Sequence, residues 1–107
     1  MEIEQYLEEL LKAQRQIQSI TLRDYQEKCS VMFRWILNEG SKLIGDEADV
    51  YQKPLWHINY TKDNQFTGIR KVTSQKRKDA ALSDLIRHFD QDLGLLIRQV
   101  TAIIGRV

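Results

Sequence analysis

Hydrophobic residues recur at helical spacing in two long stretches of the chain. Residues 2–18 carry an apolar side chain every three or four positions, from Ile3 to Ile17. Residues 75–106 carry a longer stripe of the same kind, which begins at Leu82. Apolar residues that repeat with a period near 3.6 share one face of a helix. The pattern therefore predicts helices over about 2–18 and 75–106.

A further helix start is marked around residue 21. The segment Thr21-Leu22-Arg23-Asp24 fits a capping box, in which the first residue and the acid three positions later each accept the other's backbone N–H. Ile20 and Tyr25 stand where a hydrophobic staple would close this box. We therefore expect a helix over about 22–44. Its apolar face is formed by Tyr25, Cys29, Met32, Phe33, Ile36 and Leu37.

The hydrophobic period changes in the middle of the chain. Residues 55–60 alternate between apolar and polar side chains, as a half-buried strand does. The dipeptide Asp63-Asn64 supplies turn-forming residues, and residues 66–73 read as a returning strand with a bulge at Gly68. The sequence therefore predicts a central β-hairpin over about 55–73.

Together these elements predict a mainly α (α+β) fold in a single domain over residues 1–107, with three principal helices and one central β-hairpin. The last helix would be about 48 Å long, whereas a compact domain of this size is about 34 Å across. Unless the helix breaks near Gly94, part of its apolar stripe lies uncovered in a monomer. We therefore expect a homodimer, with a self-association face formed by Leu93, Leu96, Ile97, Val100 and Ile104.

Charge is distributed unevenly along the chain. Residues 61–78 hold six cations against the single acid Asp63, while residues 1–50 sum to −4 and residues 51–107 to +5. Three of the cations fall where the last helix begins, the end at which backbone N–H groups already make the potential positive. These cations could bind a partner or could pair with the acidic N-terminal helix of the same chain. We predict a partner-binding surface formed by Lys62, Arg70, Lys71, Lys76, Arg77 and Lys78.

The residues that carry catalytic or metal chemistry form no convincing constellation. The single cysteine, Cys29, excludes an intrachain disulfide and falls on a predicted buried face. Glycines are scattered and form no phosphate-binding loop. Asp84, His88 and Asp92 share one helical face, yet that face lies opposite the apolar stripe, where polar residues are expected anyway. We therefore predict no enzyme activity, no cofactor and no metal site.

Binding is the remaining class of function. We expect a small non-enzymatic interaction module that binds another protein through the basic junction, with a nucleic-acid-binding regulator as the alternative. The order of elements resembles a winged helix, with residues 30–37 as its recognition helix and residues 61–68 as its wing. The acidic start of the chain is unlike a secretory signal and no apolar run is long enough to span a membrane. We therefore expect a cytoplasmic protein with no membrane partner.

Overall fold

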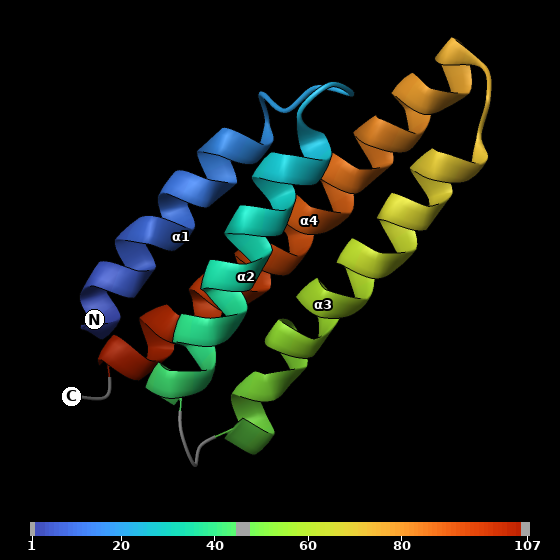
Figure 1. Ribbon diagram of the computed structural model, residues 1–107. Helices are drawn as coiled ribbons and strands as arrows, with labels where there is room; N and C mark the ends of the chain where they lie inside the picture. The colour runs from blue at the N-terminus through green and yellow to red at the C-terminus, as the bar shows by residue number, and fades with distance from the viewer. Residues whose placement is uncertain (1, 45–47, 106–107) are drawn as a thin grey trace.

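The computed structural model is a four-helix bundle in which successive helices run in opposite directions (Figure 1). Its helices are α1 (Ile3–Ile17), α2 (Tyr25–Ile44), α3 (Ala48–Lys71) and α4 (Gln75–Gly105). Each helix packs against its two neighbours in the order α1, α2, α3, α4 and back to α1. The structure describes residues 2–44 and 48–105, with side-chain surroundings for all of these except 44, 48–56, 59 and 62.

The predicted β-hairpin over residues 55–73 is wrong, because most of these residues belong to α3 and the described part of the chain contains no strand. Ile58 and Ile69 are buried, and Thr61 and Gln65 lie half-buried between them, so these positions follow one face of a helix turn by turn. Because two of these four residues are polar, the apolar residues alone do not show the helical period. The fold class is therefore all-α rather than α+β.

The winged-helix resemblance fails together with the hairpin. Residues 61–68, which would have formed the wing, are helical. A DNA-binding regulator of that architecture is therefore excluded, because the wing is one of its two defining parts.

The connection between α1 and α2 keeps the capping box in modified form. The Asp24 Oδ1 accepts a hydrogen bond from the Thr21 backbone N–H at 2.8 Å, which is the acid's half of the box. The residues of the proposed staple, Ile20 and Tyr25, are both buried. The regular helix nevertheless begins three residues later than expected, at Tyr25, because residues 22–24 form turns.

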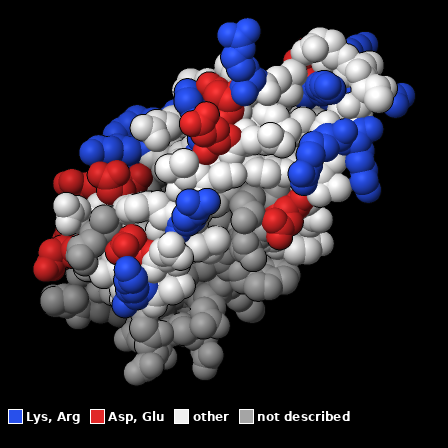
Figure 2. Space-filling view, viewed as in Figure 1, with Lys and Arg blue, Asp and Glu red and all other residues white. Residues whose placement is uncertain are grey.

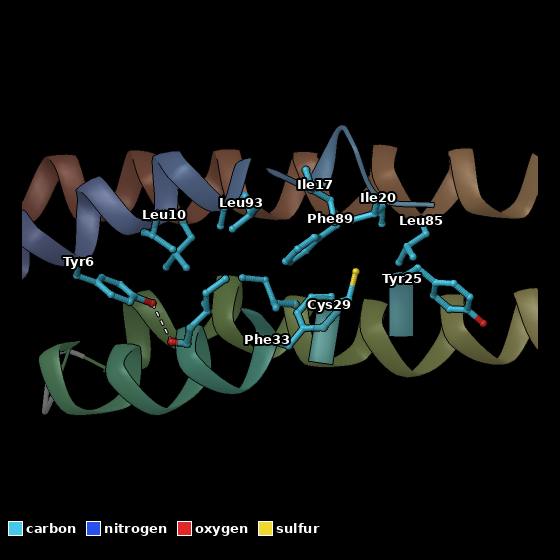
Figure 3. Packing of buried hydrophobic residues seen from close by; sticks show 14 of the residues in the cluster. Tyr6, Leu10, Ile17, Ile20, Tyr25, Cys29, Phe33, Leu85, Phe89 and Leu93 are labelled. Atoms are coloured by element: carbon cyan, nitrogen blue, oxygen red, sulfur yellow. Dashed lines mark hydrogen bonds between the residues drawn. The ribbon is translucent and has the colours of Figure 1, made fainter. Parts of the chain in front are cut away.

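The core is a single apolar cluster between the four helices (Figure 3). Phe33 packs against Phe89 with ring centroids 4.1 Å apart and ring planes inclined by 57°, which joins α2 to α4 across the bundle. Phe66 on α3 meets Tyr25 edge-on at 5.4 Å. The Tyr6 hydroxyl donates a hydrogen bond to the Ile36 carbonyl oxygen at 2.9 Å, which satisfies the one polar atom that this ring carries into the core.

The molecule is elongated, with principal extents of 50 × 23 × 18 Å. The 31 residues of α4 run without a break through Gly94, so this helix defines the long dimension. Among the helices that the structure describes, none is both long and apolar enough to cross a membrane.

Candidate functional site

The predicted cations gather where α3 ends and α4 begins, at one end of the long axis (Figure 2). Here the two helices extend beyond the turn that joins α1 to α2, so their connection forms a protruding corner of the bundle (Figure 1). We call this corner the basic tip and define it by Arg70, Lys71, Lys76, Arg77 and Lys78. Lys78 is half-buried and the other four side chains are exposed.

The local sequence explains why the chain turns here. Ser74 is the residue before α4, and its Oγ accepts a hydrogen bond from the Arg77 backbone N–H at 3.2 Å while its carbonyl accepts one from the Lys78 N–H at 3.0 Å. A serine in this position satisfies a donor that the first turn of a helix leaves free. Only residues 72–74 separate the two helices, so the cations on both sides of them are held close together.

The electrostatic setting of the tip differs between its two helices. Arg70 and Lys71 lie in the last turn of α3, where a positive charge is favourable. The first turn of α4 has no acidic residue and carries Lys76, Arg77 and Lys78, where a positive charge is unfavourable. The α4 cations therefore oppose the stability of the helix that carries them, by roughly 0.3–1 kcal/mol each where they are exposed.

Within the described chain, no carboxylate forms an ion pair with the basic tip. The side-chain ion pairs lie elsewhere, at Lys12–Glu9, Lys28–Asp24, Lys42–Glu39 and Arg87–Asp84. The nearest acid in sequence, Asp79, accepts a hydrogen bond from the Gln75 amide at 3.1 Å. Arg70 uses its Nε to donate to the Phe66 carbonyl at 3.3 Å, so its guanidinium stays on the surface.

The acidic half of α1 does not neutralise the tip. Glu2, Glu4 and Glu8 are exposed near the start of the chain, which lies at the opposite end of the bundle from the α3–α4 connection (Figure 1). The molecule is 50 Å long, several times the distance of about 8–10 Å over which salt screens surface charges. The internal pairing that the sequence left open as an alternative is therefore absent.

Lys62, the sixth predicted cation, is separate from this cluster. It precedes Arg70 by eight residues of α3, which places its backbone about 12 Å along the helix axis. Its side chain is outside the described set.

The predicted self-association face lies mostly inside the molecule. Leu93, Leu96 and Val100 are completely buried in the chain's own core, and Ile97 and Ile104 are half-buried against it. The prediction assumed a compact globule shorter than its last helix, whereas the bundle is as long as α4 and covers the stripe with its own helices. The argument for self-association through these residues therefore loses its premise.

The described residues form neither a recognisable catalytic site nor a metal site. Cys29 is completely buried, and burial, with a smaller contribution from Asp24, raises the pKa of its thiol to about 12. No group of three or more potential ligands is arranged to hold a metal ion in the described part of the chain. Of the acids weighed earlier, Asp84 pairs with Arg87 at 3.2 Å and Asp92 accepts the Thr61 hydroxyl at 2.6 Å.

Sequence reasoning missed a shallow groove between α1 and α2. Its two lobes share Gln16, Val31 and Met32, and Val31 is 62% exposed at its edge. The signal available in the sequence was weak, because Val31 stands off the apolar face of α2 like many surface valines.

Comparison with protein-family models, curated proteins and solved structures gives no match. The function of the basic tip is therefore inferred from its geometry and charge.

Proposed function

We propose that this chain is a non-enzymatic binding module whose basic tip binds an acidic region of another protein. The observation that supports this proposal is the concentration of five cations at a protruding corner without an ionic partner in the described chain. Charged residues arranged in this way attract a partner of opposite sign and fix its orientation.

The placement of the α4 cations supports a role outside the fold. Lys76 and Arg77 oppose the helix macrodipole, and a glutamate at position 77 would complete a capping box with Ser74. Residues that break a local stability rule without an internal compensation are often functional. An acidic partner would supply the missing compensation when it binds.

The experiment uses two charge reversals that change the net charge equally. Lys76→Glu with Arg77→Glu reverses the tip, while Arg34→Glu with Arg98→Glu reverses two exposed cations on α2 and α4 away from it. We expect the tip reversal to raise the free energy of unfolding by about 0.5–1 kcal/mol in urea titrations, because it places acids at the helix N-terminus. If the tip reversal is more stable and yet does not bind, the loss of binding is not caused by unfolding.

Binding is measured by quantitative mass spectrometry of proteins captured on the immobilised full chain. We expect acidic proteins that are captured by the wild type and the control reversal to fall at least tenfold with the tip reversal. Nuclease treatment should leave the capture unchanged. Equal capture by all three chains would show that the tip is not the contact surface.

A nucleic acid is the second candidate, since five neighbouring cations also suit phosphate groups. Anisotropy of a labelled mixed-sequence DNA duplex at about 50 and 200 mM salt tests it. Binding that collapses between these concentrations and disappears with the tip reversal would favour the nucleic acid over the protein partner.

A further inference from the structure

The basic tip lacks the features that a folded partner needs. The exposed large apolar side chains of the described surface are Leu11, Val31, Tyr60 and Leu95, and all lie outside residues 70–78. Three grooves of the described surface are lined by residues of α1, the α1–α2 connection, α2 and the middle of α4, and no residue of the tip lines any of these three. Interfaces between folded proteins are usually centred on apolar or aromatic anchors in pockets.

The available area is also small. The principal extents of the bundle across its long axis are 23 and 18 Å, and the tip occupies only the α3–α4 side of this end. A stable interface between two folded proteins takes about 800 Å² from each partner. A rigid acidic surface that touches this convex corner would contact only part of that area, whereas a flexible chain can follow its curvature.

The charge pattern limits the length of the partner segment. The acids Glu2, Glu4 and Glu8 lie at the far end of the 50 Å molecule, so a long polyanion along the bundle would meet repulsion there. A segment of about eight residues spans roughly 26 Å when extended, which is enough to cross the end of the bundle. Residues 70–78 include no aromatic side chain on which the bases of a single-stranded nucleic acid would stack.

We infer that the element bound by the basic tip is a short, flexible acidic peptide segment of about eight residues. This inference rests on the proposed function and specifies the partner of the same surface. Each contact is an exposed ion pair worth little alone, so the expected Kd is about 0.1–1 mM at 50 mM salt.

The experiment is an NMR titration of the ¹⁵N-labelled full chain, which suits weak binding to a 12.6 kDa protein. One probe is a synthetic peptide of eight residues in which four acidic residues alternate with serine and glycine. The second holds the same four acids in a side-chain-cross-linked helix, and the third replaces every acid with its neutral amide.

We expect the flexible acidic peptide to shift the backbone amides of residues 70–79 and to bind at least fivefold more weakly at 200 mM salt. Lys76→Glu with Arg77→Glu should weaken this binding at least tenfold. Arg34→Glu with Arg98→Glu should leave it within about twofold, because these cations lie outside the tip. The neutral peptide should shift no tip amide.

Tighter binding by the cross-linked helix than by the flexible peptide would overturn the inference and leave the proposed function standing. Absence of shifts at residues 70–79 with both acidic probes would overturn the inference and the protein partner together. Shifts of the same amides by a DNA duplex would then assign the tip to nucleic acid.

Discussion

Cys29 shows how position within the bundle determines the chemistry of a side chain. Its sulfur points into the core cluster, where it is completely buried beside the aromatic rings that join α2 to α4 (Figure 3). Loss of hydration disfavours the thiolate, which is why the pKa lies near 12 rather than near its ordinary value. Only the thiolate is a good nucleophile, so Cys29 is a packing residue at neutral pH.

This burial predicts a dependence of stability on alkaline pH. The pKa of Cys29 is about 12 in the folded state and about 8.5 in an unfolded chain, so the unfolded state loses its proton first as the pH rises. The stabilisation is complete below about pH 8.5 and decreases above it, until the pH passes the folded value. We expect the free energy of unfolding to fall between pH 8 and 10.5 more steeply in the wild type than in Cys29→Ala.

Urea titrations at several pH values measure that slope, and thiol labelling gives an independent check. The native chain should react slowly with a thiol reagent at pH 7 and rapidly in denaturant. Rapid labelling of the native chain would contradict the burial of this side chain.

At the scale of elements, the strength of the periodic signal separates what sequence could predict from what it could not. The expected helices over 2–18, 22–44 and 75–106 lie within three residues of α1, α2 and α4, because their apolar stripes are long and regular. In α3, polar side chains occupy part of the buried face, and β-branched and aromatic residues alternate by chance over 55–60. Packing against α2 and α4 overrides that local strand preference.

The basic tip was predictable for a different reason. Residues 70–78 are neighbours in the chain, so their cations converge whether the segment before them is a strand or a helix. Which side chains have no ionic partner was not predictable, because that depends on where α1 lies. The burial of Leu93 and Leu96 also depended on the shape of the whole bundle.

Gly68 distinguishes the helix from the expected bulged strand. A Cβ added there meets no atom within 4 Å, and alanine is favoured over glycine inside a helix by about 0.5–1 kcal/mol. We expect Gly68→Ala to raise the melting temperature by about 4 °C. Gly94→Ala is the matched variant on α4, where the new Cβ would lie 3.9 Å from the Gln14 amide nitrogen and should be stabilising too.

Calorimetry measures both glycine variants. A loss of stability confined to Gly68→Ala would contradict a helical backbone at that position. A gain at both positions is the result expected for two uninterrupted helices.

At the scale of the whole molecule, the fit between helix length and bundle length matters most. The long axis of 50 Å is close to the length of α4, about 46 Å for 31 residues. The α1 residues Leu10 and Ile17 and the α2 residue Phe33 belong to the same core cluster as the α4 stripe. The bundle therefore has one continuous core rather than a globule with a projecting arm.

Two adjacent leucines test whether the α4 stripe belongs to the core or to a contact between copies. Leu96 is completely buried and Leu95 is 44% exposed. We expect Leu96→Ala to lower the free energy of unfolding by about 2–5 kcal/mol through loss of packing, and Leu95→Ala to lower it by much less. Urea titration gives the stability, and sedimentation equilibrium gives the mass of each variant. If Leu96→Ala instead lowered the molecular mass in solution and left the free energy of unfolding unchanged, Leu96 would lie in a contact between two copies of the chain.

The separation of charge along the bundle also affects how the molecule moves before any contact is made. Cations at one end and exposed glutamates at the other give the described part of the chain an electric dipole along its longest axis. In the field of a negatively charged object such a body rotates, so that its positive end leads while it is still diffusing. A larger fraction of encounters then begins with the positive end facing the partner, and the association rate constant rises at low ionic strength.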